Sequence, residues 1–133
     1  MRGERDLGLL LASMEPVLVE GRFVFCTAPQ APEGLHPVVT VGEPEGTTMV
    51  LERDEADRAG LAYSYVAAMI TLRVHSALDA VGLTAAVATE LAAHGLSCNV
   101  VAGFFHDHLF VGYDDRRTAV GLLEALAERA ATG

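Results

Sequence analysis

Lysine and tryptophan are both missing from this chain of 133 residues, and its 18 acidic residues outnumber its nine arginines. The formal net charge at pH 7 is therefore −9. Nucleic acids and anionic membrane surfaces are bound through a basic face that displaces counterions. This charge balance predicts a protein that binds neither nucleic acid nor membrane.

Targeting signals, long apolar runs and abundant cysteine are lacking as well. The first residues mix four charges with a short leucine run, which is too charged and too brief for a secretory signal. No segment approaches the roughly 20 apolar residues of a membrane-spanning helix. Cys26 and Cys98 each lie in an apolar, strand-like run, so we expect buried free thiols in a cytoplasmic protein, although a single disulfide is the alternative.

Apolar residues are what the chain does have. They make up 51% of it, against 20% charged residues, which is enough for a packed core. A chain of this length forms one ordinary domain or two very small ones. It buries roughly two thirds of its unfolded surface, so it should fold without disulfides or metals.

The periodicity of the N-terminal half predicts short helices and strands. Leucines spaced i, i+3 and i+4 predict a helix over 7–14 that stops at Pro16. A run rich in valine and phenylalanine predicts a strand over 17–27, with a bulge or tight turn at 20–22. The remaining elements expected here are a proline-rich loop over 28–37, a hairpin of strands 38–41 and 47–51, and a helix over 54–60 capped by Asp54.

The C-terminal half has a clearer order of elements. Alternating residues predict a strand over 69–75, and an alanine-rich segment predicts a helix over 80–93. The last helix begins at Asp114 or Asp115 and carries a buried stripe. Between the helices we expect strands over 98–105 and 109–113, joined by a hairpin turn at His106, Asp107 and His108.

This order predicts an α+β protein with a ferredoxin-like antiparallel sheet and helices on one face. Residues 69–131 give strand, helix, strand, strand, helix, and one more strand completes the βαββαβ unit. That strand should come from the N-terminal half, with Phe23 to Cys26 as the candidate. We therefore expect two interlocked sub-domains, 1–65 and 66–133, that share a core and meet at 62–68.

The C-terminal half resembles a known family. The segment ITLRVHSALDAVGLTAAVATELAAHGLSCNVVAGFFHDHLFVGY, which starts at Ile70, is similar to ACT domains, and more closely to a group of small stand-alone bacterial ACT-like proteins. The matching features are a V-H-S turn, an A-V-G-L-T-A helix start, a G-L-S-C-N-V-V-A-G strand and the H-D-H-L-F-V segment. Upstream, P-V-L and M-V-L-x-R fit the N-terminal part of that group.

The resemblance implies a small-molecule sensor that binds an amino acid or a related effector and pairs through its sheets into a homodimer. Because the chain has no room for an enzyme domain, the regulated partner must be a separate protein. The alternative function is a ligand-free structural or protein-interaction dimer module. Whether the functional unit is a two-lobed monomer or a dimer is left open.

The resemblance also implies a ligand site between a strand-to-helix turn and an opposing strand. A helix N-terminus offers free N–H groups that suit a carboxylate. The alternative is that Ser76 or Asp79 only caps the helix, that Gly82 is a packing position, and that Asn99 faces water. The implied ligand-binding residues are His75, Ser76, Val81, Gly82, Leu83, Thr84, Asn99 and Val100.

Metal and catalytic sites are not expected. His106, Asp107 and His108 permit a metal site or a ligand-lining role, but Asp107 suits a tight turn, and no further ligand completes a coordination sphere. No phosphate-binding loop, dinucleotide motif or zinc-protease motif occurs. We therefore predict no catalytic residues, no metal and no cofactor.

Overall fold

The structure, a computed structural model, describes residues 6–74 and 80–133. Its strands form one antiparallel sheet in the order β2-β3-β1-β4-β6-β5. Within the described residues, no helix combines the length and apolar character needed to cross a membrane. The elements are α1 (Leu7–Ser13), β1 (Glu15–Ala28), β2 (Val39–Glu43), β3 (Gly46–Glu52), α2 (Arg53–Arg58), β4 (Val66–Arg73), α3 (Leu83–Ala93), β5 (Asn99–Ala102), β6 (Asp107–Gly112), the 3₁₀ turn η1 (Tyr113–Asp115) and α4 (Arg116–Thr132).

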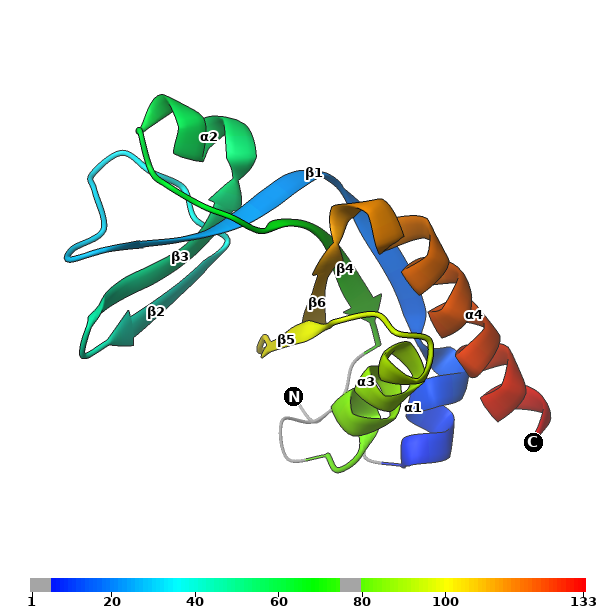
Figure 1. The fold of residues 1–133 in the computed structure, drawn as a ribbon. Helices are drawn as coiled ribbons and strands as arrows, with labels where there is room; N and C mark the ends of the chain where they lie inside the picture. Colours follow the sequence, from blue (N-terminus) through cyan, green and yellow to red (C-terminus); the bar gives the residue numbers. More distant parts are fainter. Residues whose placement is uncertain (1–5, 75–79) are drawn as a thin grey trace.

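The sheet contains two ferredoxin-like units that share their central strands. One unit consists of β1, β2, β3, α2 and β4, and the other of β4, α3, β5, β6, α4 and β1. Strand β1 is therefore the first strand of the N-terminal unit and also completes the C-terminal unit. Strand β4 is the last strand of the N-terminal unit and the first strand of the C-terminal unit. Figure 1 shows β1 running through both parts of the molecule. The first crossover helix of the N-terminal unit is replaced by the loop 29–38, which holds three of the five prolines.

A bulge lets β1 serve both units without losing its alternation of faces. The register steps from Val19 opposite Met69 to Phe23 opposite Ala67, so four residues of β1 advance against two of β4. Because the insertion is even, Val19 and Phe23 still point to the same face. Gly21 in the bulge has φ +117°, a conformation that favours glycine. The interruption expected at 20–22 is confirmed as this bulge.

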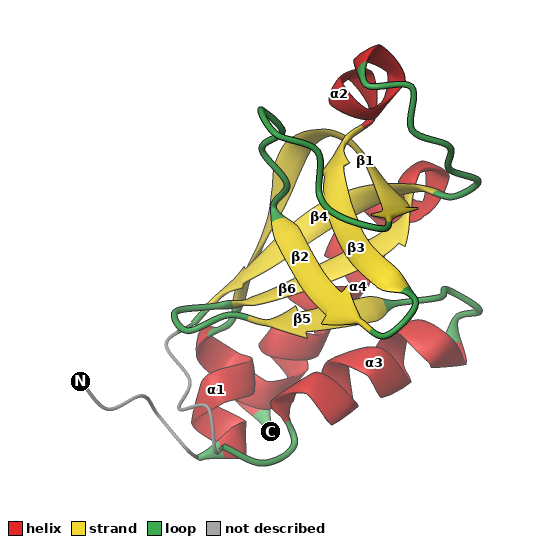
Figure 2. Cartoon of the chain, turned by 90° about the vertical axis from the view of Figure 1, so that its left-hand side faces the viewer, coloured by secondary structure: helices red, strands yellow, loops and turns green. Residues whose placement is uncertain are grey.

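The helices cover one face of the sheet in two clusters. Helices α1, α3 and α4 pack over the C-terminal unit, where Leu10, Ile70, Leu109 and Leu123 are fully buried. Helix α2 covers the N-terminal unit, and its Ala56 packs with Val24, Cys26, Met49 and Leu51. Figure 2 shows α1, α3 and α4 together on one side of the twisted sheet. The expected helices on one face are thus confirmed.

The opposite face of the sheet carries its own apolar cluster. Phe23 and Phe110 are buried, with ring centroids 6.4 Å apart, and Phe25 lies 5.5 Å from Phe110 in an edge-to-face contact. Val50 and Ala67 pack with them. Aromatic edge-to-face pairs add to the stability that burial alone provides. The sheet is therefore apolar on both faces near its centre.

Several expected boundaries were wrong. The strand that closes the C-terminal unit pairs mainly through Glu15–Val19, whereas Phe23–Ala28 pairs with β3. Strand β4, which begins at Val66 inside the expected junction at 62–68, belongs to both units. Helix α3 begins at Leu83 rather than at residue 80. The shared strands explain the first of these errors, since β1 continues from one unit into the other and leaves no break in the sequence pattern.

Candidate functional site

The strand-to-helix connection expected to hold a ligand joins β4 to α3. Gly82 is the residue before the helix and has φ +102°, which an L side chain rarely adopts. Gly82 has no side chain that could cap the helix, and the first turn of α3 contains no acidic residue. The first N–H groups of an α-helix have no partner within the helix, so they can receive a carboxylate.

Gly82 also has a packing role. A Cβ atom placed on it would lie 3.1 Å from Cδ2 of Leu7, so the first residue of α1 contacts the start of α3. The leucine side chain is only partly covered, with 37% of the residue exposed. Helix α1 therefore borders the β4–α3 connection, a contact that no local sequence pattern reveals.

The other predicted residues of this connection differ in exposure. Val81 is 83% exposed and Thr84 is exposed, whereas Leu83 is 3% exposed and belongs to the core under α3. The predicted positions His75 and Ser76 lie outside the described residues. Val81 and Thr84 are thus the predicted residues here that a ligand can reach from solvent.

The opposing strand β5 divides the two remaining predicted residues between faces. Val100 lies opposite Leu109 and packs on the helix-covered side. Asn99 lies opposite Phe110, whose ring belongs to the cluster on the other face. Cross-strand partners share a face, so the structure does not bring Asn99 and Gly82 together within one chain. Asn99 is exposed on an edge strand of the sheet.

Asp107 is a polar residue of this region that was expected from the sequence to lie in a turn. It is the first residue of β6, lies opposite Leu72 near the end of β4, and is 9% exposed. Its carboxylate has no hydrogen-bond or ion-pair partner among the described residues. Burial raises the pKa of this carboxyl, although the neighbouring His108 and His106 oppose the shift. This environment favours the neutral carboxyl, and a bound cation would favour the charged form.

The expected turn lies earlier than the His-Asp-His sequence. The N–H of Gly103 donates to the carbonyl of His106 at 2.9 Å, so the hairpin turn ends at His106. The period-two pattern of Asp107, Leu109 and Val111 is the signal that could have placed Asp107 on a strand. All three face the helices, since Leu109 and Val111 belong to that core.

The two histidines do not join Asp107 in a metal site. His108 occupies the strand position next to Asp107, so its side chain points to the opposite face. Its Nδ1 lies 3.0 Å from Oγ1 of Thr71, and burial lowers its pKa. Among the described residues, no group of three His, Cys, Asp or Glu side chains is placed to hold a metal ion.

Both cysteines are free thiols. Cys26 is buried beneath α2 and Cys98 is half-buried beside the core of the C-terminal unit. Burial raises the pKa of both thiols, and Asp57 adds to the effect at Cys26. A raised pKa disfavours the reactive thiolate.

The chain belongs to the ACT-domain family. ACT-domain models match residues 2–68 and residues 65–125, so both units fall within the family. The predicted ferredoxin-like ACT fold with two interlocked sub-domains is confirmed. ACT domains are ligand-binding regulatory domains, and neither matching model is that of a catalytic family. No functionally curated protein matches the sequence.

Solved structures agree with this assignment. A Vibrio cholerae protein of unknown function, described as a possible transport protein, is 50% identical, with a TM-score of 0.83 over 91% of this chain and 95% of its own. An Agrobacterium tumefaciens protein shares the fold at 19% identity, with a TM-score of 0.71 over 86% of this chain and 89% of its own. The aspartate kinase of Clostridium acetobutylicum, described as an allosteric enzyme, is 10% identical, with a TM-score of 0.62 over 85% of this chain and 34% of its own.

Proposed function

We propose that the protein is a regulatory sensor that binds a free amino acid at the end of β4 and acts on a separate partner protein. The observation that carries this proposal is the position of Asp107. Its buried carboxylate lies opposite Leu72, on the same face of the sheet as Leu83 in the first turn of α3. A negative group and the positive end of a helix therefore face the same side of the sheet.

This pair of groups suits a zwitterion. The first-turn N–H groups of α3 would receive the α-carboxylate, because a helix N-terminus favours negative charge. Asp107 would accept from the α-ammonium group, which gives its carboxylate a partner that the described residues do not supply. The hydroxyl of Thr84 would add a hydrogen bond. His75, Ser76, Val81, Gly82, Leu83 and Val100 complete the proposed site.

Asn99 enters this proposal only through a second copy of the chain. It lies on β5, an edge strand with one free side, and edge strands readily pair with another chain. A homodimer formed through the sheets would place Asn99 of one protomer near the other protomer. Its amide both donates and accepts, so it can bind either charged group of an amino acid.

The test is a thermal-shift screen of the purified protein against the twenty amino acids. A ligand present at 100 times its dissociation constant stabilises the folded state by about 2.7 kcal/mol, which raises the melting temperature by several degrees. We expect one amino acid or a small related set to do this. The Asp107→Asn variant keeps the shape of the side chain and should lose most of that shift.

The matched control is Asp114→Asn, which makes the same chemical change at an exposed position in η1. It should keep the full shift. A shift that survives Asp107→Asn unchanged would remove Asp107 from the site. A screen in which no amino acid stabilises the protein, while light scattering still shows a dimer, would favour the structural-module alternative.

A further inference from the structure

A cluster of arginines lies where the two units meet. Arg22, Arg53, Arg116 and Arg117 are four of the nine arginines of a chain with net charge −9. They line neighbouring cavities around the bulge of β1, with volumes of about 160, 360 and 320 Å³. Arg22 and Arg53 line the first two, and Arg116 and Arg117 line the third. This site is separate from the β4–α3 connection.

Tyr113 holds two of these guanidinium groups. Cζ of Arg22 lies 4.1 Å from the centroid of its ring, and Cζ of Arg116 lies 3.9 Å from it. Arg116 also donates from Nη1 to the carbonyl of Tyr113 at 2.9 Å. Such contacts between cations and an aromatic ring fix the guanidinium groups in place before any ligand arrives.

In a protein with an excess of carboxylates, arginines are expected to form ion pairs. In the part of the chain that the structure describes, none of the four arginines of this cluster forms an ion pair with a carboxylate. Arg116 and Arg117 also occupy the first turn of the 17-residue helix α4, where the helix dipole disfavours positive charge. Asp115, the residue before the helix, makes no capping bond with its side chain. Two arginines therefore lie where the helix dipole disfavours them, although Asp114 and Asp115 directly precede the helix.

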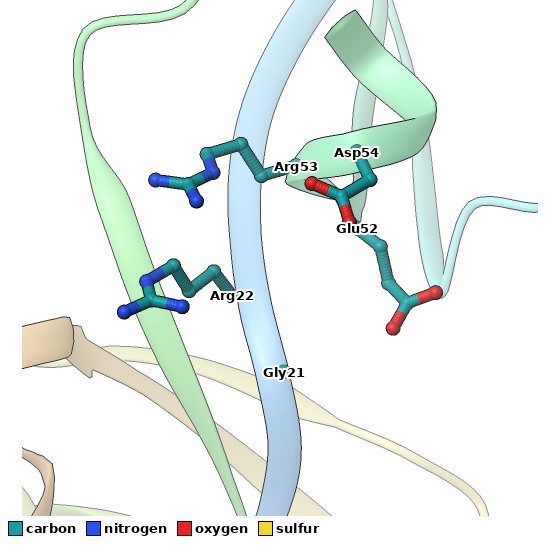
Figure 3. Close-up of a pocket in the computed structure, with 5 residues that line it drawn as sticks. All are labelled: Gly21, Arg22, Glu52, Arg53 and Asp54. Carbon is teal, nitrogen blue, oxygen red and sulfur yellow. The ribbon is translucent and has the colours of Figure 1, made fainter. Parts of the chain in front are cut away.

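Figure 3 shows how the smallest cavity is arranged. Arg22 comes from β1 and Arg53 from the start of α2, and both side chains extend to the same side of β1. The carboxylates of Glu52 and Asp54 lie on the other side in this view. The two guanidinium groups therefore lie on the same side of β1, away from the carboxylates of Glu52 and Asp54, and they share the neighbouring cavity with Asp114 and Asp115.

We propose that three arginines of this cluster, Arg22, Arg53 and Arg116, together with Tyr113, bind the phosphate group of a small phosphate monoester. Two converging guanidinium groups match a doubly charged oxyanion, since each can donate two parallel hydrogen bonds. The positive end of the α4 dipole adds to the attraction. The acidic residues in the cavity walls (Glu20, Glu52, Asp54, Asp114 and Asp115) repel a long polyanion, so the proposed ligand is a single compact phosphate and not a nucleic acid.

The experiment is a titration of the full chain with inorganic phosphate, followed by calorimetry at constant ionic strength in chloride. Wild type should bind phosphate, and Arg22→Gln and Arg53→Gln should each weaken binding by about tenfold or more. Arg58→Gln is the matched control, because it removes the same charge from α2 at a residue that lines none of the three cavities. It should bind as wild type does. Among the described residues, the guanidinium groups stacked on the Tyr113 ring are those of Arg22 and Arg116, so the Arg53 variant tests binding while keeping both of these contacts.

Succinate, titrated in parallel, separates a phosphate site from a dicarboxylate site. Tighter binding of succinate than of phosphate would overturn the proposed ligand class. Absence of phosphate binding, or equal binding by wild type, Arg22→Gln and Arg53→Gln, would overturn the site. Arg22→Gln should keep the amino-acid shift described above, so failure of this proposal is distinguishable from failure of the proposed function.

Discussion

Asp107 illustrates what a single residue contributes and what local sequence conceals. A histidine on either side makes the segment look like an exposed polar turn, yet Asp107 is 9% exposed and is the first residue of a strand. Its burial follows from pairing with Leu72 and from the helices above it, which are contacts across the chain. Gly82 was identified from the sequence, but its contact with Leu7 was not. The sequence therefore pointed to Gly82 and Asp107 as residues of interest, but it did not show the burial of Asp107 or the contact of Gly82 with Leu7.

The stability of the protein should depend on pH through Asp107. Because burial raises the pKa of the folded carboxyl, the folded state binds this proton more tightly than the unfolded chain. Stability from this group is thus complete below the ordinary range near pH 4 and is lost as the pH rises through the raised pKa. We expect Asp107→Asn to abolish that loss, measured as melting temperature between pH 4 and 8 without ligand.

His108 acts in the opposite direction and is present in both proteins. Burial lowers its pKa, so its protonation below about pH 6.5 costs stability. The difference in melting temperature between wild type and Asp107→Asn therefore reports the effect of the Asp107 carboxyl, because His108 contributes equally to both proteins. Glu124→Gln, at an exposed position of α4, is the control and should follow wild type. Parallel curves of melting temperature against pH for wild type and Asp107→Asn would show that burial does not raise the pKa of this carboxyl.

At the scale of elements, periodicity located most of the helices and strands. The hairpin of β2 and β3 and the long helix α4 lie close to their expected ranges, because turn residues and a buried stripe specify them locally. Helix α3 starts later than expected, because Gly82 and not a polar cap precedes it. The role of α1 could not be predicted: seven residues form a marginal helix alone, and packing against α3 and α4 stabilises it.

Helix α1 should stabilise the fold through one buried side chain. Leu10 is fully buried in the core of the C-terminal unit, so Leu10→Ala should lower the free energy of unfolding by about 2–5 kcal/mol. Leu9, on the same helix, is 58% exposed, and Leu9→Ala should change the free energy of unfolding by no more than about 0.5 kcal/mol. Urea denaturation measures both. Equal effects of the two substitutions would mean that α1 does not pack as described.

At the scale of the whole molecule, the two units cannot be separated without breaking the sheet. Strands β1 and β4 each belong to both units, and β1 pairs with β4 through Glu15–Val19, Phe23 and Val24. The sequence predicted two interlocked units, because the C-terminal pattern lacked one strand. It did not predict that both central strands are shared, since pairing between distant strands leaves no local signal.

The fragment 66–133 should therefore fail to fold by itself. It lacks β1 and α1, so β4 becomes a free edge and the core loses Leu10 and Met14. We expect poor dispersion in its NMR spectrum and low helix content by circular dichroism. The intact chain should unfold in one transition, with coincident curves from circular dichroism and tyrosine fluorescence. A well-dispersed spectrum from the isolated fragment would contradict the shared-strand architecture.

The most direct test of effector binding is an NMR titration of the ¹⁵N-labelled chain with the amino acid that stabilises it most. Binding at the end of β4 should shift the amide signals of Gly82, Leu83, Thr84 and Asp107, because these groups would contact the ligand. The signals of Arg22 and Arg53 should stay in place. Shifts confined to the arginine cluster, or no saturable shifts at all, would contradict an amino-acid site at the start of α3.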